Sequence, residues 1–269
     1  MVEPKSQAAS KPLTYASYLK VEELLSLQQP LSEGPEHDEM LFILIHQVYE
    51  LWFKEVLHEL DYLKARLTAG DATTSQATLK RILTVFKTLV AQIDVLETMT
   101  PVDFNSFRFR LESASGFQSG QFRELEFVLG RKRESMVRHF GGTPTAERLA
   151  RRLGEPTVWD AFLRFLARKE HPVPQELLDR DVSAPAQPDP RIQDILIGIY
   201  RDDPEVSAVC ERLVDLDEGL QEWRYRHVKM VERTIGMKPG TGGSAGADYL
   251  RTTLFEPVFP DLWAIRSRL

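Results

Sequence analysis

The sequence has almost no cysteine, since Cys210 is the only one among 269 residues. One thiol excludes an intrachain disulfide and any zinc site built from several cysteines, and it is typical of a reducing compartment. A basic surplus is missing too, because 34 Lys and Arg stand against 40 Asp and Glu and leave a net charge of -6. Such a charge balance produces no positive electrostatic potential that would attract nucleic acid or an acidic membrane surface.

Long hydrophobic runs are also absent. The longest uninterrupted aliphatic or aromatic run, Met40 to Ile45, is far too short to span a bilayer. Residues 1–12 are polar and lack the apolar core of a signal peptide, so we expect a disordered tail there. We therefore expect a soluble, cytoplasmic protein with neither nucleic acid nor membrane among its partners.

No strand pattern and no internal repeat is found. Apolar residues instead recur every three or four positions, which is the spacing along one face of an α-helix. The pattern predicts an all-α fold with long antiparallel helices, forming one domain over residues 13–269. Helices are expected between Thr14 and Pro30 and over residues 38–67, 79–96, 121–138, 147–153, 157–169, 192–200, 206–235 and 248–255.

Two stretches break this pattern. Residues 101–130 lose it before helix resumes at Gln121, and residues 171–190, which hold five prolines, form an irregular surface excursion. The first long helix, in contrast, carries two adjacent apolar rows in its N-terminal half. We expect that half to be deeply buried.

Two histidines lie inside apolar helical stripes. His227 follows Trp223 on the last long helix, and His46 lies between Phe42 and Tyr49 on the first. Burial favours the neutral imidazole, which can ligate a metal or accept a hydrogen bond from a substrate N-H. A histidine on an apolar face is also an ordinary core residue. Both interpretations stay open at this point.

Other catalytic centres are disfavoured. A carboxylate-bridged di-iron bundle needs two Glu-x-x-His motifs, and the single one, Glu55 to His58, lies on a charged, solvated face. No serine or cysteine has a nucleophile-elbow context. Haem needs one neutral axial imidazole, an apolar slot and a group on the far side, which His227 and His46 would supply.

Three further segments allow two interpretations each. Arg108 and Arg110 lie among phenylalanines and are either surface cations or an anion-recognising pair. The glycine-rich run 240–246 is expected to be either a mobile loop or a phosphate cradle, and the second is disfavoured because the run lacks the Gly-Lys-Ser/Thr ending of a phosphate-binding loop. The aromatic start, with Tyr15 and Tyr18, packs either on the body of its own chain or into a neighbouring subunit.

Several long motifs resemble those of one known family, the tryptophan 2,3-dioxygenases. They are His37 to Lys54 (HDEMLFILIHQVYELWFK), Phe107-Arg108, Ser115 to Ser119 (SGFQS) and Lys238 to Ser244 (KPGTGGS). The match runs in order from Leu13 to Trp263, nearly the whole chain. Motifs of this length are far more specific than a single glycine pattern.

The resemblance implies an all-α haem enzyme that inserts both atoms of O2 into the indole C2-C3 bond of L-tryptophan and forms N-formyl-L-kynurenine. It also implies a homotetramer, with one haem b per subunit and ferrous iron in the active form. A non-enzymatic haem-binding sensor is the first alternative and a helical scaffold the second. The sensor hypothesis does not explain why the sequence carries Arg108 and the loop that holds Thr241.

The resemblance assigns the haem and indole side of the site. His227 would be the proximal iron ligand, and Ser115 and Gly116 would contact the haem. His46 would be the distal histidine that accepts a hydrogen bond from the indole N-H. Phe42 would pack against the indole ring.

The resemblance also assigns the amino-acid end of the substrate. Arg108 would bind the carboxylate, and Thr241 would hold this end beneath a closing loop. Phe104 stands where some members carry tyrosine, and Ala245 replaces the second serine of the common loop. Three N-terminal residues would enter the pocket of the neighbouring subunit: Tyr15, Tyr18 and Leu19.

Overall fold

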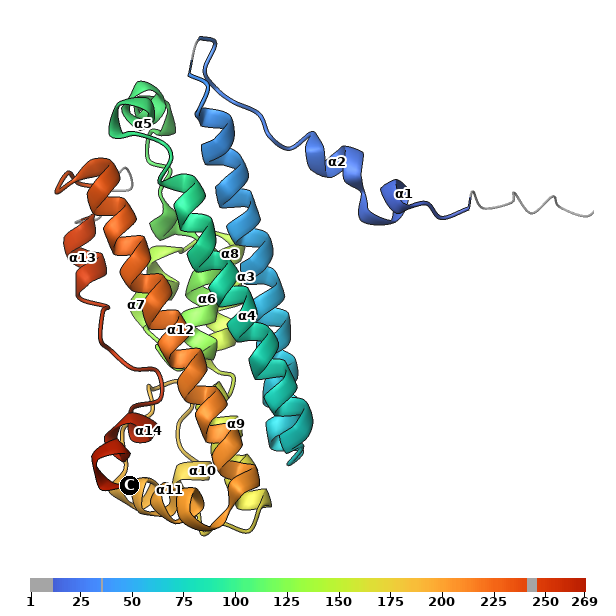
Figure 1. The fold of residues 1–269 in the computed structure, drawn as a ribbon, viewed down its shortest axis with the longest axis vertical. Helices are drawn as coiled ribbons and strands as arrows, with labels where there is room; N and C mark the ends of the chain where they lie inside the picture. Colours follow the sequence, from blue (N-terminus) through green and yellow to red (C-terminus); the bar gives the residue numbers. More distant parts are fainter. Residues whose placement is uncertain (1–11, 35, 241–245) are drawn as a thin grey trace, which may run out of the picture.

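Three long helices run side by side and form the body of the protein: α3 (Glu39–Thr68), α4 (Ala72–Leu96) and α12 (Pro204–Ile235) (Figure 1). The structure, a computed structural model, describes residues 12–34, 36–240 and 246–269. Within these ranges the chain is all-helical, as predicted, without a strand. Helix α4 packs against both α3 and α12.

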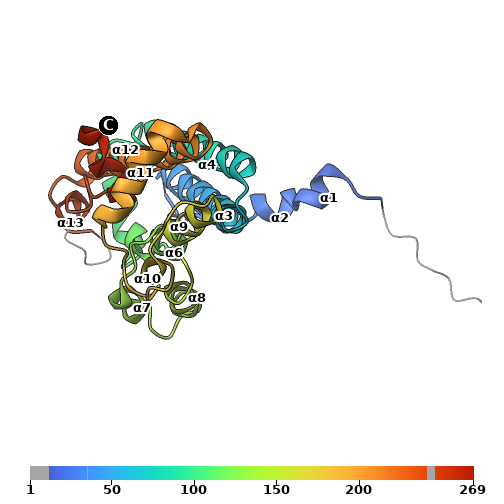
Figure 2. The same ribbon diagram turned by 90° about the horizontal axis from the view of Figure 1, so that it is seen from below.

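Shorter helices cover the long ones. Helices α6 to α10 gather on one side of the long helices (Figure 2), and α11 and α14 pack on the end of α12 where that helix begins. None of the helices within the described ranges combines the length and the apolar character that crossing a bilayer requires. The shorter helices are α1 (Tyr15–Leu19), α2 (Val21–Leu25), α5 (Pro101–Arg108), α6 (Gly120–Val128), α7 (Glu134–His139), α8 (Pro144–Leu153), α9 (Val158–Arg168), α10 (Gln175–Leu178), α11 (Pro190–Asp202), α13 (Ala247–Arg251) and α14 (Pro260–Ala264).

Local signals set the ends of the long helices. The Asp71 side chain accepts a hydrogen bond of 3.0 Å from the Thr74 N-H at the start of α4, and Asp203 caps α12 in the same way. Pro204 occupies the first position of α12, where a missing N-H costs nothing. Gly236 ends α12 with a φ of 61°, a conformation that glycine adopts without strain.

The core lies where α3, α4, α9 and α12 meet, and phenylalanines and branched aliphatic residues fill it. Gly219 of α12 lets this helix approach α4 closely, since a Cβ at this position would lie 2.8 Å from the Leu83 side chain. The largest fully buried side chains here include Phe86, Phe162, Phe165, Leu60, Leu63, Leu79, Ile82 and Leu89. Packing of the predicted apolar stripes therefore accounts for the three-helix body.

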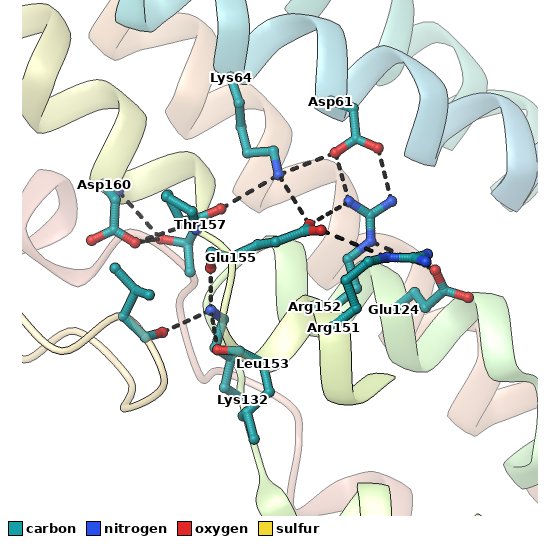
Figure 3. A network of polar contacts seen from close by, with 12 residues as sticks. Asp61, Lys64, Glu124, Lys132, Arg151, Arg152, Leu153, Glu155, Thr157 and Asp160 are labelled. Atoms are coloured by element: carbon teal, nitrogen blue, oxygen red, sulfur yellow. Dashed lines mark hydrogen bonds and ion pairs between the residues drawn. The ribbon is translucent and has the colours of Figure 1, made fainter. Parts of the chain in front are cut away.

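A polar network anchors the shorter helices to α3 (Figure 3). Arg152 forms a bidentate pair with Asp61, with N-O distances of 2.7 and 2.8 Å. The Lys132 ammonium donates to the carbonyls of Leu153 and Val182 at 2.9 and 2.7 Å. The proline-rich residues 171–190 are irregular apart from the single turn of α10, as predicted, and these bonds hold them against the body.

Three predicted helical stretches differ from the structure. The expected helix after Thr14 is two helices, because Lys20 has a φ of 55° and ends α1. Gly130, with a φ of 106°, likewise divides the expected helix 121–138 into α6 and α7. Helix α5 was missed, although Thr100 and Asp103 form a capping box ahead of it.

The N-terminal half of α3 is not deeply buried, which corrects the prediction from its two apolar rows. Met40, Leu44 and Leu51 are exposed. Helices α1 and α2 project away from the body and leave this face of α3 uncovered (Figure 1). Helix α3 therefore carries more apolar side chains than this one chain buries.

Asp217 fastens the C-terminal segment to α12, and its loss is expected to destabilise the fold. The buried carboxylate accepts hydrogen bonds from the N-H groups of Val258 and Phe259 and from Trp263 Nε1, at 2.8, 3.0 and 3.0 Å. Asp217→Leu leaves these donors without an acceptor, so we expect the free energy of unfolding to fall by about 3 to 5 kcal/mol in urea titrations. Asp215→Asn, on the same helix but partly exposed, should change it by under about 0.5 kcal/mol. Equal effects would contradict the anchoring role.

Candidate active site

A cavity of about 260 Å³ lies among α3, α4, α5, α6 and α12. A second cavity, beside Trp159, measures about 30 Å³, which is room for little more than one water. The larger cavity therefore can hold a sizeable ligand. Its walls bring together seven of the predicted site residues: Phe42, His46, Phe104, Arg108, Ser115, Gly116 and His227.

The remaining predicted residues are not among the described residues that line this cavity. Thr241 and Ala245 lie outside the described residues. The side chains of Tyr15 and Tyr18 are 79% and 69% exposed. Together with Leu19 they lie on a segment that points away from the body (Figure 1).

His46 is a neutral hydrogen-bond acceptor. Its Nδ1 lies 2.7 Å from the Phe42 carbonyl oxygen. A carbonyl only accepts, so Nδ1 carries the proton and Nε2 keeps its lone pair. Burial lowers the pKa of His46 below its usual 6.5, and the Phe42 carbonyl and the Glu50 carboxylate only partly oppose this effect.

His227 is the second neutral imidazole of the cavity. Its ring lies parallel to that of Trp223, with 5.2 Å between centroids and an angle of 5°. Burial lowers the pKa of His227 to about 4, and the nearby imidazole of His46 and guanidinium of Arg123 further disfavour its protonation. Among the described residues none forms a hydrogen bond to this ring, so a nitrogen lone pair is available for a metal ion.

Aromatic side chains form an apolar slot beside His46. Phe42 lies 5.7 Å from Phe104 and 5.5 Å from Phe107 between ring centroids, and it contacts the imidazole of His46 at 4.2 Å. Phe104 is buried and brings no hydroxyl group into the slot. Such walls suit a flat aromatic ligand.

Polar groups mark one end of the cavity. Arg108 Nη2 donates a hydrogen bond of 2.7 Å to the Pro239 carbonyl, which ties the end of α5 to the segment after α12. Ser115 begins a single 3-10 turn, and its Oγ accepts from the Phe117 N-H at 3.3 Å. A Cβ added at Gly116 would meet no atom within 4 Å, so a larger residue would occupy space available to a ligand.

Sequence reasoning missed four charged residues in the cavity wall: Glu50 of α3, Arg123 and Glu126 of α6 and Arg224 of α12. Arg123 Nη1 lies 2.6 Å from Glu126 Oε2, and Arg224 Nη2 lies 3.7 Å from Glu126 Oε1. The available signal was position, since Arg224 precedes His227 by three residues on the same helix.

The other histidines take no part in the site. His58 is exposed, as expected for a solvated face. In the described ranges no three His, Cys, Asp or Glu side chains converge on a metal position. An iron ion held by His227 therefore needs further ligands from elsewhere, which a porphyrin would provide.

Comparisons with known proteins point in the same direction. A family model described as tryptophan 2,3-dioxygenase matches residues 2–168 and 160–269. The chain is 62% identical to the tryptophan 2,3-dioxygenase of Herpetosiphon aurantiacus over 260 residues, covering 97% of this chain and 100% of that protein. It is 57% identical over 270 residues to the protein of the same name from Anaeromyxobacter sp. (strain K), with 100% of both covered. The protein of that name from Caulobacter vibrioides is 42% identical over 261 residues, covering 96% and 98%.

Proposed function

Because this chain belongs to the tryptophan 2,3-dioxygenase family, we propose that it inserts both atoms of O2 across the indole C2-C3 bond of L-tryptophan and forms N-formyl-L-kynurenine. The observation that carries this proposal is one cavity that combines two neutral histidines, an aromatic slot and Arg108. A haem sensor would need only the axial histidine. The comparisons give that alternative no support.

Haem b is the cofactor of this proposal, with one per subunit and ferrous iron in the active form. The available imidazole of His227 suits an axial ligand, and stacking on Trp223 fixes the plane of the ring. Ser115 and Gly116 border the space that the porphyrin would occupy. When bound, haem supplies the binding and activation of O2.

The distal side of the cavity would position the substrate. His46 Nε2 accepts the hydrogen bond from the indole N-H, and Phe42 packs on the indole ring. Arg108 binds the carboxylate, and Thr241 holds the amino-acid end. Because Phe104 offers no hydroxyl, Arg108 has the larger share in recognising the carboxylate. The phenylalanine walls exclude water from the reacting indole.

A homotetramer is part of the same proposal. The segment with Tyr15, Tyr18 and Leu19 buries none of its side chains against its own chain, and α3 exposes apolar residues. Exposed apolar surface of this kind favours contact with another subunit, whose pocket these residues would reach. Residues 13–269 would form one haem dioxygenase domain after the tail 1–12, and its compartment would be the cytoplasm.

Turnover tests the proposal. The haem-loaded, reduced protein should consume O2 and L-tryptophan in equal amounts and release N-formyl-L-kynurenine through many cycles, followed by absorbance and chromatography. A haem sensor would bind its ligand and yield no product. A scaffold would remain without haem absorption even after reconstitution.

Tryptophan binding is expected to weaken in acid, with a midpoint below pH 6.5. The lowered pKa keeps His46 mostly neutral at neutral pH, and protonation removes the lone pair that accepts the indole N-H. The value of kcat/KM should therefore fall toward acid pH with a midpoint below 6.5 and level off at higher pH. In His46→Ala this decline should disappear. A midpoint above 6.5 in the unaltered protein would contradict the assignment.

A further inference from the structure

Three arginines share one buried carboxylate behind His227. Glu126 accepts from Arg123 Nη1 at 2.6 Å and from Arg133 Nη2 at 2.9 Å, and Arg224 Nη2 lies 3.7 Å away. The side chains of Arg123, Glu126 and Arg224 are at most 5% exposed. Water therefore does little to screen this concentration of positive charge.

Arg224 is the least satisfied member of this group. Within the described ranges its Nη2 has no hydrogen-bond partner, because 3.7 Å from Glu126 is too long for a hydrogen bond. Its Nη1 makes one long contact, 3.4 Å, with the Thr253 carbonyl. A buried donor without an acceptor is costly, so its presence indicates that a ligand supplies one.

Nearby acidic groups do not offset the charge of Arg224. Glu256 pairs with Arg131, and the Asp217 carboxylate accepts three N-H groups of the C-terminal segment. Burial and the charge of Arg131 lower the pKa of Arg224 to about 10 despite Glu126, Asp217 and Glu256. The cavity wall therefore has room for one more negative charge.

Arg123 and Arg224 both line the cavity that holds His227. Arg224 is three residues from His227 on α12, which places both side chains on one face of that helix, and Arg123 is joined to Arg224 through Glu126. We propose that Arg224, with Arg123, binds a propionate carboxylate of the porphyrin and so sets the rotation of the haem in the cavity. This assignment rests on the proposed haem function. The other ligand that could bring a carboxylate to Arg224 is the substrate, L-tryptophan.

Haem and haem dimethyl ester differ only at the propionate groups, which carry a charge only in haem, so comparing their affinities measures what the carboxylates contribute to binding. Equilibrium titrations of the apoprotein with haem and with haem dimethyl ester should show tighter binding of haem. In Arg224→Met we expect this preference to shrink by about tenfold to 100-fold, because a charge-assisted hydrogen bond is lost, while the affinity for the ester stays unchanged. Arg133→Gln is the matched control. Arg133 bonds the same carboxylate, but its side chain is 32% exposed and does not line the cavity, so the preference should persist.

Arg224→Lys is the control for a folding defect. It keeps the positive charge, so it should retain part of the preference for haem over the ester. Equal weakening of haem and ester in Arg224→Met, with Arg224→Lys behaving alike, would overturn the proposal and leave a structural role. A weaker tryptophan affinity with an unchanged haem preference would assign the charge to the substrate and also overturn it. If the unaltered protein bound neither haem nor the ester, the proposed haem-dependent function itself would be wrong.

Discussion

His227→Ala is expected to abolish stable haem binding and, with it, tryptophan turnover. Two imidazoles line the described cavity wall, and we assign His227 to the iron and His46 to the substrate, because the Nδ1 of His46 already bonds the Phe42 carbonyl while the ring of His227 lies flat against Trp223. The His227 pKa of about 4 means that no proton competes with the metal at neutral pH. Because changes at residues that merely support a ligand already cost about tenfold to 100-fold in metal affinity, loss of the ligand itself should exceed about 100-fold.

Absorbance titrations with haem measure this loss directly. His46→Ala is the control, because it removes a histidine from the same cavity and should leave haem affinity nearly unchanged. Added imidazole should restore part of the haem absorption of His227→Ala by filling the space of the missing ring. An unchanged haem affinity in His227→Ala would show that another residue is the ligand.

Arg108→Leu is expected to raise KM for L-tryptophan by about tenfold to 100-fold, which corresponds to the ~1.5 to 3 kcal/mol of a hydrogen bond to a charged group. The guanidinium is held at the cavity end by its bond to Pro239. It offers a paired donor geometry that fits a carboxylate. Phe104 brings no second donor to the site, so little compensates for the loss.

Substrates that lack the carboxylate make this test specific. Binding of such indole analogues should be spared in Arg108→Leu, as judged by their effect on the spectrum of the reduced haem. Arg110→Leu is the matched control, since Arg110 donates to the Leu31 carbonyl and does not line the cavity. Equal losses for tryptophan and for the analogues would refute a role in carboxylate binding.

The sequence predicts the long helices well because their apolar stripes repeat over many turns. Helices α3 and α12 therefore begin and end close to their expected bounds, and α4 ends where expected but begins at Ala72, seven residues before the expected start at Leu79. Short elements are harder to predict, since single residues decide them. The positive φ values of Lys20 and Gly130 divide two predicted helices, and α5 depends on one capping box.

Periodicity alone identifies His46 and His227 as unusual inward residues, and it leaves a structural role open for both. The roles of Arg108 and Thr241 come only from the resemblance to a family. For Arg224 the only sequence signal was its position three residues before His227, and Arg123 had none, because charged residues are expected on the surface and only the fold brings both beside Glu126. The uncovered face of α3 was not expected either, because apolar periodicity predicts which side chains favour burial and does not say what covers them.

The most direct test is a spectroscopic titration of the reduced, haem-loaded protein, first with L-tryptophan without oxygen and then with O2. We predict that tryptophan changes the haem spectrum by binding beside it, and that O2 then converts tryptophan into N-formyl-L-kynurenine in equal amounts while the reduced spectrum returns. A haem spectrum that ignores tryptophan, or oxygen binding without this product, would contradict the proposed dioxygenase function.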